Sequence, residues 1–131
     1  MNFLQVMEYY RSYTIIGNKL GRTIATPTLN LKIEQSLDLE FGVYVFEVIL
    51  FAQKYYAVGT YGFRESVDQK LTLEVHILDS KFLHPELYYV QLAVRAIKFL
   101  RPMKKFAGLK ALKQQLEIDK KLASNYVRTL A

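Results

Sequence analysis

Short runs of apolar, β-branched and aromatic residues fill the chain from about residue 8 to residue 100, with turn residues between them. Runs of this length and composition are typical of β-strands. We expect six strands, at residues 8–16, 28–33, 43–51, 54–60, 70–78 and 88–99. No helical pattern separates them, so the chain is expected to form an antiparallel barrel or sandwich.

The period of the apolar positions changes at Phe106. Leucines then recur at helical spacing, with polar residues on the other face: Leu109, Leu112 and Leu116 against Lys110, Lys113, Gln114 and Glu117. This predicts a helix over about residues 107–128, or two helices with a break near Asp119. The run 43–51 is apolar on both faces, as a barrel strand covered by a helix would be.

Composition narrows the class of protein. The 131 residues suit one domain, with the barrel at about 8–100 and the helix behind it. Cysteine is absent, which excludes disulfides, thiol catalysis and cysteine-ligated metal. No apolar run is long enough to span a bilayer, and the first residues do not read as a signal peptide. We therefore expect a soluble, cytoplasmic protein.

The charge is uneven along the chain. Residues 1–100 carry ten charges of each sign, whereas residues 101–131 carry eight basic and two acidic residues, so the net +6 lies in the tail. A basic tail can serve a nucleic acid, a membrane surface or an anionic small molecule such as ATP. It can equally be a solvated helix face.

The first candidate site is a glycine-bearing basic loop followed by two oxygen-bearing side chains. Such a loop can wrap phosphates with backbone N–H groups and positive charge, and hydroxyl and amide oxygens suit Mg²⁺. The residues are Gly17, Lys19, Gly21 and Arg22 in the loop, then Thr28 and Asn30 after Pro27. An ordinary β-turn loop is the alternative interpretation.

The second candidate lies on the strand expected at 70–78. Alternation places Leu73 and Val75 on one face and Thr72, Glu74 and His76 on the other. A carboxylate on a rigid strand is a good general base for a hydroxyl, and His76 on the same face is the rival base. The alternative is a solvent-facing strand with ordinary polar residues.

The third candidate is the connection from the last strand to the helix, which contains Arg101 and Phe106. An arginine here could contact phosphate or stack on a planar ring, or Pro102 could simply end the strand. The chain has no Walker A sequence and no G-x-G-x-x-G, which disfavours a P-loop kinase or a Rossmann enzyme.

Taken in order, these stretches resemble the riboflavin kinase (flavokinase) family over roughly residues 10–125. The resemblance rests on Gly-x-x-x-Gly-Arg-Thr-Ile from Gly17, Pro-Thr-x-Asn from Pro27, Gly-Val-Tyr from Gly42, Leu-Glu-Val-His-Ile-Leu-Asp from Leu73 and Leu-Arg-Pro-x-Lys-x-Phe from Leu100. It implies a six-stranded Greek-key barrel with a C-terminal helix. It also implies transfer of the ATP γ-phosphate to the riboflavin 5′-hydroxyl.

The resemblance also implies roles for the candidate residues. Thr28 would bind Mg²⁺ and phosphate, with Zn²⁺ or Mn²⁺ as alternative metals, and Asn30 would support that metal site. The loop from Gly17 to Arg22 would cover the phosphates of ATP. Glu74 would be the base, with Arg101 and Phe106 on the flavin side.

Several positions depart from the family pattern, among them Ala25, the stretch from Thr60 to Ser66, Tyr89 and Met103. They leave open a weak or inactive flavin- or nucleotide-binding relative with a regulatory role. A small nucleic-acid-binding barrel is a third, less favoured interpretation. The His-x-Gly-His motif of the adenylyltransferase domain, to which bacterial relatives are fused, is absent. FAD synthesis would therefore require a separate adenylyltransferase as partner.

Overall fold

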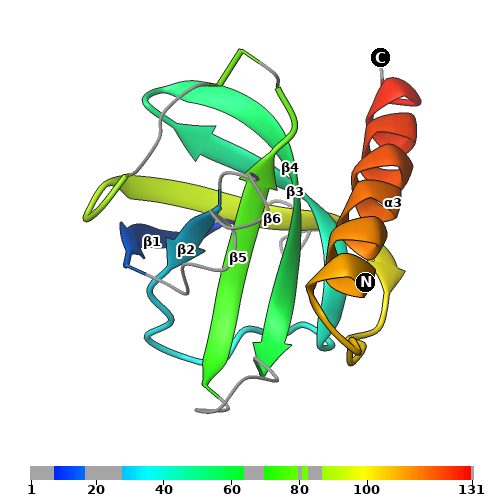
Figure 1. Ribbon diagram of the computed structural model, residues 1–131. Helices are drawn as coiled ribbons and strands as arrows, with labels where there is room; N and C mark the ends of the chain where they lie inside the picture. The colour runs from blue at the N-terminus through cyan, green and yellow to red at the C-terminus, as the bar shows by residue number, and fades with distance from the viewer. Residues whose placement is uncertain (1–7, 17–27, 64–69, 80, 83–86, 131) are drawn as a thin grey trace.

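The computed structural model describes residues 8–16, 28–63, 70–79, 81–82 and 87–130. Within these residues it contains six strands and one helix (Figure 1). The strands are β1 (Tyr10–Ile15), β2 (Leu29–Leu31), β3 (Gly42–Leu50), β4 (Gln53–Phe63), β5 (Leu71–Ile77) and β6 (Gln91–Arg101), and the helix is α3 (Leu109–Arg128). No helix among the described residues is long and apolar enough to cross a membrane.

The six strands close into a barrel in the order β1-β2-β5-β4-β3-β6. Every pairing is antiparallel. Strand β5 pairs with β2, and β6 joins β3 to β1, so the order is not that of a simple meander. This confirms the antiparallel Greek-key barrel and decides against an open sandwich.

Alternating side chains fill the barrel interior. The inward residues of β3 are aromatic or branched and buried, and they pack with inward residues of the other strands, including Tyr61, Leu73 and Val75. The outward valines of β3, Val43 and Val45, are also buried because α3 covers them. Strand β3 is therefore apolar on both faces because a helix covers its outer face, as predicted.

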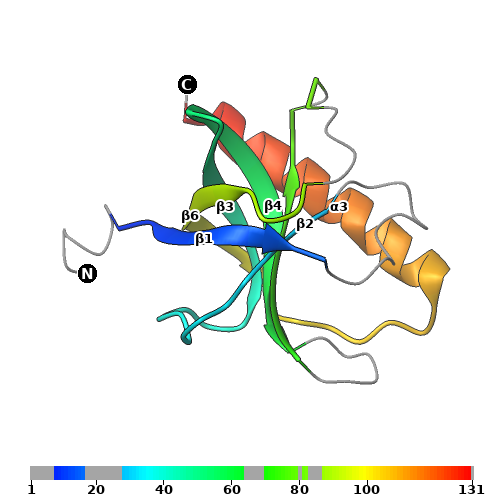
Figure 2. The same cartoon turned by 90° about the vertical axis from the view of Figure 1, so that its left-hand side faces the viewer.

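Helix α3 is one continuous helix, so the predicted alternative of a break near Asp119 is wrong. Its Ala123 packs on Val43, Val45 and Val58 on the outside of the barrel. Figure 1 shows α3 on the opposite side of the barrel from β1, and the turned view of Figure 2 agrees. The wall formed by β2, β5 and β4 lies between these two sides.

Candidate active site

The strand register brings Glu74 between two polar side chains. On β5 it lies opposite Asn30 of β2 and, on its other side, opposite Thr60 of β4. Directly opposed residues of an antiparallel pair have Cβ atoms about 4.5–5.5 Å apart. Asn30, Glu74 and Thr60 therefore form one row across the outer wall of the barrel.

A second row lies beside the first along the same strands. His76 is two residues after Glu74, so its side chain shares the outer face, and Val58 of β4 is its partner in register. The Thr28 hydroxyl lies 3.2 Å from Nδ1 of His76. The first row thus places Asn30 beside Glu74, and the second places Thr28 beside His76.

Burial distinguishes His76 from the other polar residues of β5. Thr72 and Glu74 are half-buried, but His76 is only 7% exposed. Strand alternation correctly predicts the face of β5 on which His76 lies, but it does not predict that His76 is buried. Thr28 and Val58 lie beside the ring, and the packing of Val58 beneath α3 excludes solvent from that part of the wall.

Gly59 allows β4 and β5 to approach closely. Its backbone pairs with Val75, and a Cβ at this position would collide with the carbonyl oxygen of Glu74 and the ring of Phe46. Glycine is the residue that permits such a close approach. Gly59 therefore helps to fix the backbone that carries Glu74.

The side-chain oxygens of Thr28 and Asn30 suit a magnesium ion that keeps water and phosphate ligands. They do not form a site in which protein side chains supply every metal ligand. Thr28 and Asn30 offer a neutral hydroxyl and a neutral amide oxygen, which are hard ligands. The described residues contain no group of three or more histidine, aspartate or glutamate side chains that could enclose a metal. Magnesium usually keeps several waters and takes phosphate oxygens, so two protein oxygens beside a carboxylate fit it.

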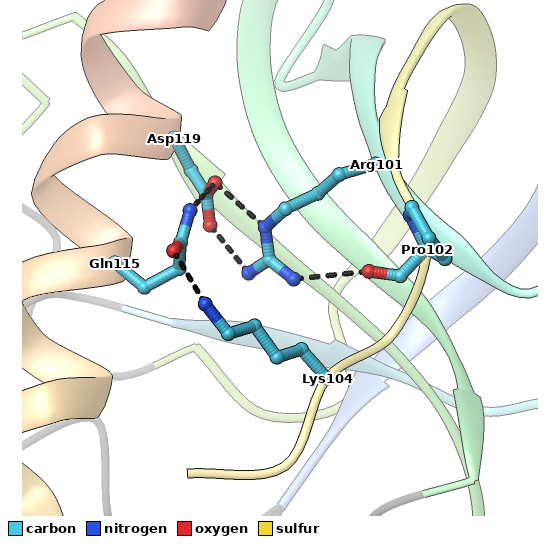
Figure 3. A network of polar contacts seen from close by, with 5 residues as sticks. All are labelled: Arg101, Pro102, Lys104, Gln115 and Asp119. Atoms are coloured by element: carbon cyan, nitrogen blue, oxygen red, sulfur yellow. Dashed lines mark hydrogen bonds and ion pairs between the residues drawn. The ribbon is translucent and has the colours of Figure 1, made fainter.

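Arg101 lies at the end of β6 and is engaged by the helix (Figure 3). Its Nε and Nη2 donate to the two carboxylate oxygens of Asp119, at 2.9 and 2.8 Å, and its Nη1 donates to the Pro102 carbonyl at 3.0 Å. Gln115 donates to the same carboxylate at 3.0 Å and accepts a hydrogen bond from Lys104 at 3.4 Å. This pairing fastens the connection after β6 to α3.

Arg101 and Phe106, the two residues predicted to contact the flavin, lie close to each other. The Phe106 ring is 5.9 Å from the Arg101 guanidinium and 5.7 Å from the Lys104 ammonium. The guanidinium is bound in a bidentate pair to Asp119, which is only 1% exposed. A flavin contact by Arg101 stays a prediction, and the structure adds an anchoring role that the sequence did not suggest.

Other sequence candidates lie outside the described residues. These are Gly17, Lys19, Gly21 and Arg22 of the predicted phosphate loop. Conversely, sequence reasoning did not select Thr60 or Asp119 as contributors. Thr60 becomes visible only through its register with Glu74, and Asp119 only through its pairing with Arg101.

A second glutamate on the outer wall, Glu47 of β3, lies in a different environment. Its Oε2 accepts hydrogen bonds from the Tyr9 hydroxyl at 2.7 Å and from Arg95 at 2.5 Å, and its Oε1 is 3.9 Å from the Lys54 ammonium. Burial alone would raise the pKa of Glu47, but these hydrogen bonds and the nearby positive charges lower it overall. The same hydrogen bond, followed by burial and the charge of Glu47, raises the pKa of Tyr9.

Comparison with known proteins identifies the family. The family model for riboflavin kinase (flavokinase) matches residues 7–127, nearly the whole chain. This chain belongs to the riboflavin kinase family. The resemblance carried by the short motifs is thereby confirmed.

Two curated relatives show how much of a longer protein this chain matches. The bifunctional riboflavin kinase/FMN adenylyltransferase of Listeria monocytogenes is 34% identical over 122 residues, which are 90% of this chain and 38% of that protein. The protein of the same name from Bacillus subtilis is 30% identical over 135 residues, 98% of this chain and 42% of that protein. The chain therefore spans about two fifths of the length of these relatives.

A solved structure has the same barrel. It is a crystal structure described as a macrolide-efflux protein from Streptococcus pneumoniae, which matches with a TM-score of 0.76 and 31% sequence identity. The match covers 89% of this chain and 38% of that one. The likeness therefore extends over the barrel and the helix together.

Proposed function

We propose that this chain is a riboflavin kinase, which transfers the γ-phosphate of ATP to the 5′-hydroxyl of riboflavin and releases FMN and ADP. The observation that carries the proposal is the register of β2, β5 and β4, which aligns Asn30, Glu74 and Thr60 on one wall. The hydroxyl of Thr28, hydrogen-bonded to His76, lies in the next row. Family membership and the names of the two bacterial relatives support the same activity.

Glu74 would act as the general base. Phosphoryl transfer requires the attacking hydroxyl and the phosphate to be in line. The protein contributes by positioning these groups and by stabilising charge in the transition state. The riboflavin 5′-oxygen forms a bond to the γ-phosphorus, the bond to the β,γ-bridging oxygen breaks, and the hydroxyl proton passes to the Glu74 carboxylate. Strand β5, which is paired on both sides, keeps this carboxylate in place.

Thr28 and Asn30 would bind the nucleotide side of the reaction. Their oxygens are suited to Mg²⁺ and to phosphate oxygens, and a bound magnesium ion would neutralise charge on the phosphates. The segment 17–27 leads directly into Thr28 and carries the predicted loop residues Lys19 and Arg22. Its positive charge would favour an anionic nucleotide.

Incubation with riboflavin, ATP and MgCl₂, followed by chromatography, tests the proposal directly. We expect FMN and ADP in equal amounts, and none when ATP or the metal is omitted. Thr28→Ala should lower kcat strongly and raise the Mg²⁺ concentration needed, because one oxygen ligand is lost. Binding of riboflavin and nucleotide without any FMN would instead identify an inactive relative, and wild-type kinetics in Thr28→Ala would refute its assignment.

A further inference from the structure

His76 is the one buried polar residue on β5, and one of its contacts is with a residue of the proposed nucleotide site. Its Nδ1 lies 3.2 Å from the hydroxyl oxygen of Thr28, 48 positions away in the sequence. The ring lies on the same strand face as Glu74, but its Nδ1 is directed to Thr28. A histidine so placed acts on the chemistry through Thr28.

The chemistry of a hydroxyl group indicates which partner donates the proton in the hydrogen bond between Thr28 and His76. A threonine hydroxyl has one proton and two lone pairs. If the proton is donated to a neighbouring acceptor, both lone pairs remain for a cation or for a donor on the other side. A neutral imidazole with its proton on Nε2 provides such an acceptor at Nδ1.

We propose that His76 is a positioning residue that accepts the Thr28 hydroxyl proton and so directs the Thr28 lone pairs toward the divalent cation and phosphates. This inference rests on the proposed kinase function and assigns His76 a role in nucleotide and metal binding. The buried setting of the His76 ring beside Val58 strengthens the hydrogen bond, since little water competes for the imidazole. The arrangement is that of an outer residue that orients a metal ligand.

Two amide substitutions separate this role from a merely structural one. In His76→Asn, the amide oxygen can occupy the place of Nδ1 and accept the same proton. In His76→Gln, the amide lies further out, near the place of Nε2, and the acceptor beside Thr28 is lost. Thr72→Val, on the same face of β5, controls for general disturbance of the strand, because the Thr72 hydroxyl bonds only to the Gly62 carbonyl among the contacts described for it.

Titration calorimetry with ADP, with and without Mg²⁺, is the first measurement. We expect His76→Gln to weaken Mg²⁺-dependent ADP binding roughly 10–100-fold, the usual range for residues that orient metal ligands. His76→Asn should restore most of that affinity, and Thr72→Val should leave it unchanged. Riboflavin affinity should stay the same in all three variants.

The tautomer of His76 is the second measurement, and it needs no ligand. Nitrogen-15 NMR of the wild-type protein at pH 8 should show His76 protonated on Nε2 and unprotonated on Nδ1. A proton on Nδ1 would mean that His76 donates to Thr28, and it would overturn the inference.

The remaining outcomes separate this inference from the kinase proposal. If the wild type makes FMN and His76→Gln binds Mg-ADP normally, the positioning role is wrong and the kinase proposal survives. Equal loss in His76→Asn and His76→Gln, in proportion to lost stability, would make His76 a structural residue only. If the wild type makes no FMN but only His76→Gln loses Mg²⁺-dependent ADP binding, the positioning role stands and the kinase proposal fails.

Discussion

Two glutamates on the outer wall of the barrel, Glu47 and Glu74, arise from the same strand alternation but have different neighbours. Glu47 accepts hydrogen bonds from Tyr9 and Arg95 and has Lys54 nearby. Glu74 has an amide and a hydroxyl residue, Asn30 and Thr60, as its partners in register. The neighbours of Glu47 fix its charge within the fold, whereas the two register partners of Glu74 carry no charge.

The comparison shows that the role of a strand residue depends on the strands beside it. Nothing in the sequence immediately around either glutamate states which cross-strand partners it will have. On the Glu47 side, β6 supplies Arg95, and the chain just before β1 supplies Tyr9. On the Glu74 side, the three-residue strand β2 supplies Asn30. Substitutions of the two glutamates and of Lys54 test whether Glu47 is structural and Glu74 chemical.

The largest effect is expected from Glu74→Gln. This change preserves size and removes the basic carboxylate, so kcat should fall roughly 10²–10⁴-fold, the usual range for a general base. The variant should fold, and it should still bind ADP and riboflavin. Steady-state kinetics and calorimetry measure both properties.

Glu47→Gln is the matched control for that experiment. The chemical change is identical, but the carboxylate lies on β3 among Tyr9 and Arg95, and not beside Asn30 and Thr60. The kcat of Glu47→Gln, at a temperature where the variant is folded, should therefore stay close to the wild-type value. A greater loss of kcat in Glu47→Gln than in Glu74→Gln would reverse the assignment of the two glutamates.

Much of the fold was predictable from local patterns, because each strand and the helix carry their own periodicity. The run 43–51 even predicted its covering helix, since an outward valine must be buried by something. The length of β2 was not predictable: residues 28–33 were expected, but the strand covers only Leu29–Leu31.

The candidate site was predictable only in part. The family motifs selected Thr28, Asn30 and Glu74. The register brings Asn30 and Glu74 together, and Thr28 contacts His76, two residues after Glu74. The burial of His76 and the pairing of Arg101 with Asp119 depend on contacts between distant segments. Such contacts leave no periodic signal in the sequence.

The second effect in size concerns the stability of Glu47→Gln. Loss of the carboxylate charge leaves Arg95 partly buried beside a neutral amide and weakens two hydrogen bonds. We expect a loss of roughly 1–3 kcal/mol in the free energy of unfolding, as for hydrogen bonds to charged groups. Urea unfolding measures it, and a stability equal to that of the wild type would show that the cluster contributes nothing.

The same cluster predicts a dependence on pH. The pKa of Glu47 is lowered from its ordinary value of 4.5, so the unfolded chain binds this proton more readily than the folded one. The stability that ionised Glu47 contributes is therefore present above about pH 4.5 and is lost as the pH falls through the folded-state pKa. The difference in unfolding free energy between wild type and Glu47→Gln should be constant near neutral pH and shrink in acid. A difference that grows in acid would contradict the lowered pKa.

The smallest effect is expected from Lys54→Met, at the edge of the Glu47 cluster. The Lys54 side chain is half exposed, its ammonium is 3.9 Å from Glu47, and it also lies 5.4 Å from the ring of Tyr56. Water and salt screen such a pair, and holding a long side chain in place costs conformational entropy. The melting temperature of Lys54→Met should therefore match that of the wild type at physiological salt and differ only slightly at low salt. A loss of stability as large as that of Glu47→Gln would contradict this expectation. It would mean that the exposed Lys54, rather than Tyr9 and Arg95, fixes the charge of Glu47.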